Sequence, residues 1–559
     1  MMRQLDGSTL EGGGQLVRIA VALSALTGQP LRISRIRGNR SGSKGLKASH
    51  CAAIKFLLDV CGGTAEGNQV GRHEMAFYPR GKQTGNDPQD EKDVDSDVRE
   101  TTASLQQLSL SSMHDSPRVT VKPEYDIRLS TPGSIFLIFQ ALYPYLLFAG
   151  SALDTQEPLK EIQLHITGGT NVSFSPSYDY ISQVLIPNFA KLGFPSLSIK
   201  LKKRGWASGR WTELGAVSFA ISPLSVNGTT KSDTISSPSH DSGRAQAETA
   251  PVIFPSIDLE VFDKGIITQI DVTILAPDTL AQKLLKEMST KSAKGRNRDE
   301  KLQKKAVSYY DAYGRQNPNG DQDEEGEEGD EGKEAGYQSY IMDDACNMKQ
   351  GPPQTARDFL QLQTIRTLSK ELTRRAGEQG VPATQGIGAR EDEVQSHIDD
   401  VVINLHTSEA TSHYSQTYIL LVAHTSTGFR LGRDALYSSF SEPSGKNKPK
   451  DGKCGKGSKS SKESDNILLR MERMVDQCVT DLMGEFQDHP GDQGQGRRMV
   501  LPKKAVDVYM RDQIVVFEAL GKLAHPRPSI DKGGERDEEG LSLHTRTAMW
   551  VCEQMLGNR

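Results

Sequence analysis

The chain has 559 residues and a formal net charge of −5, with 36% hydrophobic and 25% charged residues. This length exceeds what one ordinary hydrophobic core supports, so two or more domains are expected. The mean hydropathy of −0.52 is low for a chain that is globular throughout, and part of the length is predicted to be solvated insertion. The small negative charge excludes a chain that is basic throughout, but it leaves room for a local basic cleft.

The six cysteines form no C-x-x-C pair and no spacing typical of a metal site. No signal peptide is recognised, so a reducing intracellular compartment is expected. No apolar run approaches the roughly eighteen residues that a membrane span needs, and no membrane span is expected. The most apolar stretch, IFLIFQALYPYLLFAG, contains Gln140 and Pro144 and is interpreted as a buried helix.

Helical and extended patterns alternate along the first half of the chain. The first predicted helix is LVRIAVALSALTG, which ends at Gly28. A strand, PLRISRIRG, and a second helix, SHCAAIKFLLDVCGG, follow it. HEMAFYPR and RVTVKPEYDI are strand-like, SIFLIFQALYPYLLFA is helical, EIQLHITGGT is extended and DYISQVLIPNFAKLGF is helical. SLSIKLKKRG and GAVSFAIS complete this half as strands.

After Asp258 the same order repeats more loosely. LEVFDKGIITQIDVTIL is strand-like, and DTLAQKLLKEMST and ARDFLQLQTIRTLSKELTRRAG are helical. HIDDVVINLHT and QTYILLVAHTSTG are strands, NILLRMERMVDQCVTDLMGEF and KKAVDVYMRDQIVVFEALGKLA are helices, and LSLHTRTAMWVCEQML is a strand running into a helix. The recurrence indicates an α/β protein built from a repeated two-layer module.

Polar, low-complexity segments interrupt these elements. They carry too few apolar residues to offset the entropy of ordering, so they are interpreted as solvated loops. The main ones lie near 81–118, 226–250, 291–336 (with the acidic run DQDEEGEEGDE) and 444–463. The Lys-rich segment 444–463 also fits an RNA-tethering or nuclear-targeting role.

Three polar residues stand out near the N-terminus, within DGSTLEGGGQLVR. On a helix, Glu11, Gln15 and Arg18 fall on one face, at i, i+4 and i+7. The glycines before the helix leave backbone N–H groups unshielded, which favours an anion, and a carboxylate there could hold a cation that also touches phosphate. A glycine-flanked helix with a capping Glu and a surface Arg is equally compatible with the spacing.

Two further groups lie near the C-terminus. In VDVYMRDQIVVFEALG, Tyr509, Asp512 and Gln513 interrupt an apolar helical face, and they need partners if they are buried. A partly exposed helix rim would explain them as well. In LSLHTRTAMW, His544 precedes a predicted helix start that Thr545 or Thr547 could cap.

A neutral imidazole at position 544 suits a nucleophile or an acid–base catalyst, although a lone histidine is more often structural. The chain has no G-x-S-x-G, H-E-x-x-H or G-x-x-x-x-G-K-[ST] motif, so hydrolase triads, zincins and P-loops lack support.

Taken together and in order, these segments resemble the RNA 3'-terminal phosphate cyclase family. The resemblance rests on DGSTLEGGGQLVR, RIRGNRSGSKGLKASH, GSIFLIFQALYP, HITGGT, TSTG, VDVYMRDQ and LHTRTA. It spans the chain, with the polar segments as insertions, and its opening motif and the matching C-terminal histidine are highly specific.

The resemblance implies an enzyme of the ligase class that uses ATP and a divalent metal, Mg²⁺ or Mn²⁺. It converts a 3'-terminal phosphate of RNA into a 2',3'-cyclic phosphate through a covalent histidine–AMP and an RNA(3')pp(5')A intermediate. His544 matches the nucleophile. Glu11 would hold the metal and position the nucleophile, and Arg18 would be a further catalytic residue. Arg37 and Arg40 would bind the RNA phosphate. The positions implied to contact ATP are Gln15, Gln140, Tyr509, Met510, Arg511, Asp512 and Gln513.

The resemblance also implies a fold of three βαβαββ-like modules with a smaller inserted α/β domain of thioredoxin-like topology. The core is expected at 1–253 for the first two repeats, the insert at 254–437, and the third repeat with the nucleophilic histidine at 438–559.

The expected partner is RNA with a 3'-terminal phosphate, and further RNA-processing partners are expected to use the insertions. Nuclear localisation is an expectation from the family, in the nucleoplasm for an active cyclase. Two alternatives stay open: a non-catalytic, cyclase-like nucleolar protein acting in ribosomal RNA processing and small ribosomal subunit biogenesis, and an RNA-binding scaffold that uses the charged insertions. The nucleolar branch is expected to lack the histidine, so His544 favours the enzyme.

Overall fold

The computed structural model divides into two compact units. The first unit consists of residues 1–207, 212–263 and 502–559, and the second of 208–211 and 264–501. The structure describes residues 2–79, 121–151, 159–208, 211–224, 254–279, 339–340, 353–379, 401–440, 467–487, 505–524 and 541–557. The predicted insertions at 81–118, 226–250, 291–336 and 444–463 lie outside the described residues, as does most of the predicted helix DTLAQKLLKEMST.

The first sheet of the first unit has the spatial order β1-β2-β4-β3. β1 and β2 run parallel, and the other two pairs are antiparallel. The strands and their helices are β1 (Arg3–Asp6), α1 (Gly14–Thr27), β2 (Leu31–Ser34), α2 (Ala48–Cys61), β3 (Thr64–Glu66) and β4 (Met75–Tyr78). Both helices end at a glycine in the left-handed conformation, Gly28 and Gly62, so these predicted helix ends are confirmed.

The second sheet of the first unit, β5-β6-β10-β7, has the same pattern of one parallel and two antiparallel pairs. Its helical connection contains a π-helical turn, η1, between α5 and α6. The elements are β5 (Glu124–Arg128), α4 (Ile135–Ala149), β6 (Ile162–Gly168), α5 (Tyr178–Tyr180), η1 (Ile181–Leu185), α6 (Ile186–Lys191), β7 (Leu197–Lys203) and β10 (Gly215–Ile221). Two short strands between β7 and β10, β8 (Trp206–Ser208) and β9 (Trp211–Glu213), form a separate two-stranded sheet, and the 3-10 helix η2 (Leu259–Val261) follows.

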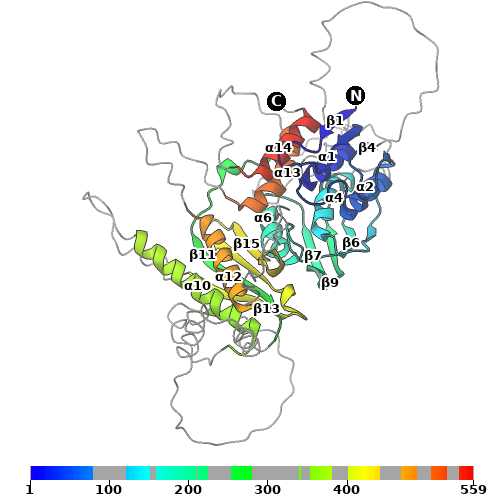
Figure 1. The fold of residues 1–559 in the computed structure, drawn as a ribbon. Coiled ribbons are helices and arrows are strands. Elements are labelled where there is room, and N and C mark those ends of the chain that lie inside the picture. Colours follow the sequence, from blue (N-terminus) through cyan, green and yellow to red (C-terminus); the bar gives the residue numbers. More distant parts are fainter. Residues whose placement is uncertain are drawn as a thin grey trace, which may run out of the picture. The chain divides into compact units, whose positions relative to one another are not determined.

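Two C-terminal helices, α13 (Val508–Ala524) and α14 (Leu543–Leu556), belong to the first unit. α14 packs against α1 and α13, so the two ends of the chain lie together (Figure 1). An aromatic core joins α13 to the second sheet: Phe139 of α4 stacks on Phe219 at 4.4 Å, and Phe517 of α13 meets Phe194 edge-on at 4.9 Å. This packing brings segments from both ends of the sequence to one place.

The second unit is a mixed five-stranded sheet, β12-β13-β11-β14-β15, with α10 and α12 packed on it. Its apolar core joins the two helices to strand residues such as Ile270, Val272 and Ile274 of β11. The elements are β11 (Ile267–Ala276), β12 (Ser339–Tyr340), α10 (Ala356–Gln379), β13 (Val402–Ala410), η3 (Tyr414–Gln416), β14 (Tyr418–Thr425), β15 (Arg430–Leu436), η4 (Tyr437–Phe440) and α12 (Ile467–Gly484).

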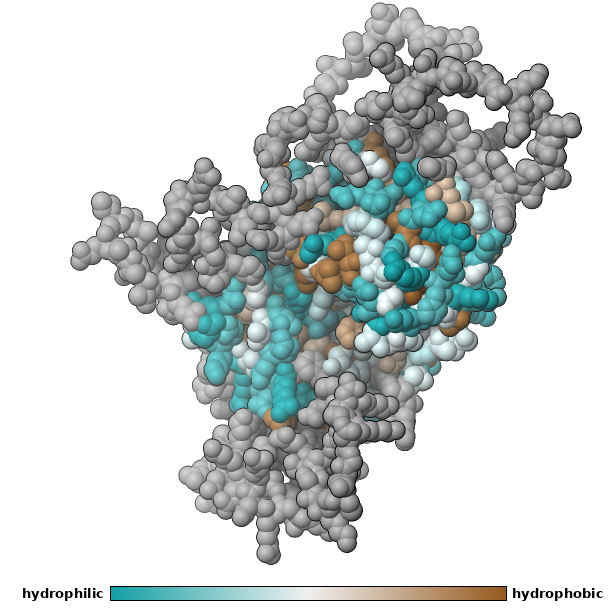
Figure 2. All heavy atoms as spheres, turned by 45° about the horizontal axis from the view of Figure 1, so that its top comes forward, coloured by the Kyte–Doolittle hydropathy of each residue, from teal (hydrophilic) through white to brown (hydrophobic). Residues whose placement is uncertain are grey.

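The mixed α/β class predicted from the sequence is confirmed by these sheets and helices. Three repeated modules, a thioredoxin-like insert and the limits 1–253, 254–437 and 438–559 stay predictions. Among the described helices, none is long and apolar enough to cross a membrane. On the face drawn in Figure 2, hydrophobic surface forms small patches bordered by hydrophilic residues.

Candidate functional site

The glycine-rich segment before α1 forms a turn instead of the first turn of a helix. Gly12 has a φ of +59°, Gly13 is the extended N-cap, and α1 begins at Gly14. The prediction that Glu11 shares a helical face with Gln15 and Arg18 was therefore wrong, because the left-handed backbone at Gly12 breaks the helical path. Gln15 and Arg18 lie on α1, and Glu11 precedes it.

The glycines also allow charged side chains to pack closely against the backbone. A Cβ on Gly13 would lie 2.8 Å from Glu11 Oε1 and 2.9 Å from an Arg40 nitrogen, and a Cβ on Gly14 would lie 2.5 Å from His50 Nε2. Any side chain at these positions would displace its neighbours. The segment thus builds a compact ionic site at the start of α1.

His544 lies in the first turn of α14, and no strand precedes that helix in the described part of the C-terminal segment. Ser542 is the N-cap, since its Oγ accepts a hydrogen bond from Thr545 N at 2.9 Å. The expectation that Thr545 or Thr547 caps the helix was wrong, because both lie inside it. Thr545 Oγ1 instead donates to Asp512 Oδ1 at 2.5 Å, which ties the start of α14 to α13.

The His544 ring faces the turn before α1. Its Nδ1 lies 2.9 Å from Glu11 Oε2 and forms a 3.2 Å hydrogen bond with Gln15 Oε1. The His544 side chain is 51% exposed, whereas that of Glu11 is only 12% exposed. The Nδ1 edge of the imidazole is thus held by the protein, while about half of the side chain is exposed.

Glu11 and His544 shift each other's pKa. The Glu11 carboxylate at hydrogen-bonding distance raises the pKa of His544 above its ordinary value, although burial opposes the shift. Burial by itself raises the pKa of Glu11, but His544, Arg40 and Arg18 outweigh it and lower the pKa. Glu11 is therefore a carboxylate at neutral pH.

Several cations converge on the start of α1. Arg40 forms an ion pair with Glu11 Oε1, and Arg18 Nε donates to Gln140 Oε1 of α4 at 2.9 Å. Burial lowers the pKa of Arg18 to about 10, so the guanidinium keeps its charge at neutral pH. Arg37 is buried, and its guanidinium donates to the backbone carbonyl of Ser43. Of the two arginines predicted to bind RNA phosphate, Arg40 thus joins the Glu11–His544 group, whereas Arg37 braces its own loop.

The five residues Tyr509 to Gln513 lie on α13, as predicted, but their side chains point to different surroundings. Tyr509 is 38% exposed, and Met510 is fully buried in the core. Arg511 pairs with Glu518 on the same helix at 2.9 Å. Asp512 faces the start of α14, where burial raises its pKa.

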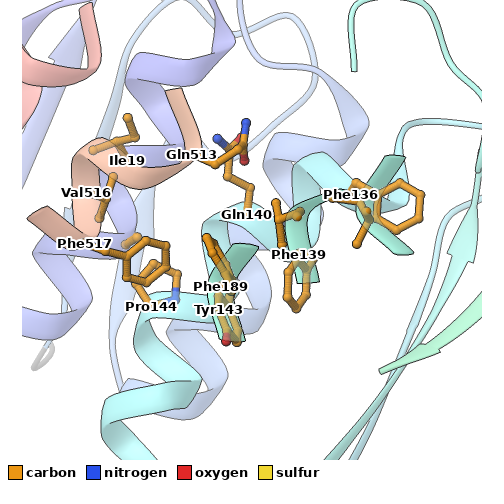
Figure 3. A pocket seen from close by; sticks show the side chains of 13 residues that line it. Ile19, Phe136, Phe139, Gln140, Tyr143, Pro144, Phe189, Gln513, Val516 and Phe517 are labelled. Atoms are coloured by element: carbon orange, nitrogen blue, oxygen red, sulfur yellow. The ribbon is translucent and has the colours of Figure 1, made fainter. Parts of the chain in front are cut away.

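Gln513 and Gln140 line one pocket, together with aromatic and aliphatic side chains of α1, α4, η1, α6 and α13 (Figure 3). The cavity has a volume of about 20 Å³, room for one water molecule, so the two amides lie at a narrow gap in an apolar core. The apolar lining residues are Ile19, Ala22, Phe136, Phe139, Tyr143, Pro144, Ile181, Leu185, Phe189, Val516 and Phe517.

His50 is a site residue that the sequence patterns did not single out. It is buried, its Nδ1 accepts a hydrogen bond from Lys47 N at 3.1 Å, and its Nε2 faces Gly14. Burial lowers the pKa of His50 well below its ordinary value, and Arg18 adds to the effect, so the ring is neutral. No local sequence pattern indicates that His50 belongs to the site, because its contact with Gly14 arises only when the chain folds.

Thr547 was considered only as a cap, yet its Oγ1 accepts a hydrogen bond from Glu11 N at 3.3 Å. Among the described residues there is no cluster of three or more His, Cys, Asp or Glu side chains that could hold a metal ion.

Comparison with known proteins agrees with the site. The sequence profile of the family described as RNA 3'-terminal phosphate cyclase matches residues 9–559. Curated relatives with that name include proteins of Methanosarcina barkeri, 35% identical over 205 residues (37% of this chain and 47% of the relative), and of Desulfurococcus amylolyticus, 34% identical over 202 residues (36% and 43%). A third, from Methanosarcina mazei, is 31% identical over 228 residues (41% and 50%).

These matches span about half the length of the curated relatives, whereas the family profile spans nearly the whole chain. The chain belongs to the RNA 3'-terminal phosphate cyclase family.

Proposed function

We propose that this protein is an active, ATP-dependent RNA 3'-terminal phosphate cyclase with His544 as its nucleophile. Family membership supports the substrate class. The observation that carries the catalytic assignment is the contact of His544 Nδ1 with Gln15 Oε1 and Glu11 Oε2. An Nδ1–H held in this way leaves the lone pair of a neutral imidazole on Nε2.

In the first step, Nε2 of His544 attacks the α-phosphorus of ATP. The new bond is N–P, and the bond broken joins the α-phosphorus to the pyrophosphate oxygen, so pyrophosphate leaves with the electron pair. Such transfers depend on positioning and charge neutralisation more than on acid–base work. Glu11 and Gln15 orient the ring, while Arg18 and Arg40 lie where they can neutralise phosphate charge.

In the second step, an oxygen of the RNA 3'-phosphate attacks the phosphorus of the histidine–AMP, and the N–P bond breaks to free His544. The adjacent 2'-hydroxyl then loses its proton to water and attacks the activated 3'-phosphorus, the bond from that phosphorus to the AMP oxygen breaks, and AMP leaves as the 2',3'-cyclic phosphate closes. Adenylation supplies the leaving group that a phosphate monoester lacks. The cations and the Glu11–His544 pair would serve both AMP transfers, from ATP to His544 and from His544 to RNA, at one site.

Gln140 and Gln513 are proposed to contact ATP through their amides, which can both donate and accept hydrogen bonds. The cavity between them has a volume of about 20 Å³, room for one water molecule, so an adenine ring would enter it only after the lining side chains move. Arg18 bonds directly to Gln140, which links this pocket to the cations that would face the phosphates. In this proposal, Met510 and Arg511 stabilise helix α13, and their side chains do not contact the nucleotide.

Glu11 is the residue proposed to hold the divalent metal, Mg²⁺ or Mn²⁺. Its Oε2 is buried and faces His544 Nδ1 at 2.9 Å, and its Oε1 pairs with Arg40. Mg²⁺ is commonly held by one or two carboxylates together with substrate phosphates, so a single carboxylate fits. When bound, the ion would neutralise phosphate charge beside the cations.

The nuclear location and the further RNA-processing partners expected from the family stay part of this proposal. The direct test is to incubate the protein with ATP, Mg²⁺ and an RNA bearing a 3'-phosphate, and to separate cyclic from open ends. The wild type is expected to form 2',3'-cyclic ends, and His544→Ala is expected to form none. An uncyclised wild-type reaction would instead favour the non-catalytic nucleolar alternative.

A further inference from the structure

Phe174 combines two unusual properties in one residue. The residue is 95% exposed, the highest value among the exposed large hydrophobic residues of the described chain. Its backbone has a φ of +60°, which costs energy for a bulky side chain. The other described non-glycine residues with positive φ are Leu10, Arg35 and Arg37, all in the loops that build the candidate site.

The loop that presents Phe174 is firmly held. The backbone N–H groups of Thr170 and Asn171 donate to Gly205 O at 2.9 and 3.0 Å, and both residues are buried. On the other side of Phe174, Ser175 Oγ donates to Val172 O at 2.7 Å. The exposed ring is therefore displayed by an ordered loop, where strain persists because the surrounding structure determines it.

This loop lies against the starts of two helices of the site. Gly169 N donates to Gly133 O at 2.8 Å, and Ile135 N, the first residue of α4, donates to Gly169 O at 3.1 Å. Beyond the loop, Tyr180 donates to Asp507 Oδ1 at 2.7 Å, and Asp507 accepts from the first N–H groups of α13. α4 carries Gln140 and α13 carries Gln513, so the loop adjoins the helices that line the pocket.

We propose that Phe174 is a stacking platform for a nucleobase of the RNA strand near its 3' end. This inference rests on the proposed function and adds a base contact to it. An exposed aromatic ring stacks on any base, independently of sequence. Arg18 and Arg40 are the cations proposed above to neutralise phosphate charge, and RNA held by them would extend its adjoining bases beyond them.

The test is the affinity of a 5'-fluorescein oligouridylate with a 3'-phosphate, measured by anisotropy without ATP. Phe174→Ala and Phe174→Leu are expected to weaken binding about tenfold, whereas Phe174→Trp stays within about twofold of the wild type. Val261→Ala, which trims another exposed apolar residue of the first unit, is the matched control and is expected to bind as the wild type.

Oligonucleotides with one abasic position locate the base. The abasic position that weakens wild-type binding should have no further effect in Phe174→Ala, because both changes remove the same contact. Additive effects, or unchanged binding by Phe174→Ala, would overturn the proposal. So would a change of oligomeric state in Phe174→Ala, which would assign the ring to a second copy.

Phe174→Gly separates this role from a structural one. Glycine relieves the strain at φ +60°, so the thermal midpoint should rise while RNA binding falls. A fall in both would mean that the ring stabilises the fold, and would contradict the proposal. Labelling of the wild type by α-labelled ATP, which needs no RNA, reports the proposed function separately from the stacking contact.

Discussion

Gln15 and His544 are 529 positions apart in the sequence, yet Gln15 Oε1 and His544 Nδ1 are joined by a 3.2 Å hydrogen bond. The contact exists because α14 packs against α1. It selects the imidazole tautomer whose Nε2 is nucleophilic, and the Glu11 carboxylate beside it favours a positive charge on the ring and raises its pKa.

The acid limb of the self-adenylation rate should report the Glu11–His544 pair. The pKa of His544 is raised, so the protonated, non-nucleophilic ring persists to a higher pH, and the rate falls as the pH drops through that pKa. Glu11→Gln removes the negative charge, so the acid limb should move to lower pH while the maximal rate falls. Single-turnover labelling by α-labelled ATP across pH measures both.

Glu213→Gln, at an exposed pair with Lys203, is the control and should leave the profile unchanged. An acid limb that stays in place in Glu11→Gln would contradict the electrostatic role of Glu11.

Gly14→Ala should impair the site by steric crowding. The added Cβ would lie 2.5 Å from His50 Nε2 and 3.2 Å from an Arg18 nitrogen, so the buried ring or the guanidinium must shift. Self-adenylation is expected to fall about tenfold or more, since small displacements at a site of phosphoryl chemistry have large effects. In Gly42→Ala the new Cβ meets nothing within 4 Å, and near-normal labelling is expected. Equal activity of the two variants would show that close packing at Gly14 is unimportant.

The arginines at 18 and 511 should differ in their importance. Arg18 bonds to Gln140 through Nε, a donor that lysine lacks, and Arg511 pairs with Glu518 on its own helix. Arg18→Lys is expected to lower the labelling rate about tenfold, whereas Arg511→Lys should change it by less than about threefold. Steady-state kinetics with varied ATP would measure both. A larger loss in Arg511→Lys would assign that side chain to the nucleotide after all.

Much of the fold could be predicted from local patterns. The apolar spacing of α1 and α2 and the glycines that follow them are local signals, and both helix ends were predicted. The first turn of α14 was not predicted, because LSL has the alternation of a strand. Only the hydrogen bond that Thr545 N donates to Ser542 Oγ shows where the helix begins.

The site was predicted as a set of residues rather than as a geometry. Glu11, Gln15 and His544 were identified by family motifs, but their contacts depend on the packing of distant helices. His50 and Phe174 were missed for related reasons. The packing of His50 against Gly14 and the positive φ of Phe174 are properties of the folded chain that no local pattern encodes.

Acid stability should depend on a carboxylate in the second unit. Burial by itself raises the pKa of Asp271, but hydrogen bonds from His424, Asn404 and Gln269 outweigh it and lower the pKa to about 2. A lowered pKa stabilises the fold above the unfolded value of about 4, and this stabilisation is lost as the pH falls towards about 2.

Asp271→Asn should therefore cost about 1 to 2 kcal/mol of unfolding free energy at neutral pH and little near pH ~2. Denaturant unfolding at a series of pH values measures the difference between wild type and variant. Asp126→Asn, at an exposed pair with Arg128, serves as the control and should cost little at any pH. A difference that does not shrink with acid would mean that Asp271 acts through shape rather than charge.

The central claim is that His544 becomes covalently adenylated, and mass spectrometry after incubation with ATP and Mg²⁺ tests it most directly. The wild type should gain the mass of one AMP moiety, acid-labile and located on the peptide that contains His544, and His544→Ala should gain none. A wild-type protein without the added mass, or with the adenylate on another residue, would contradict the account.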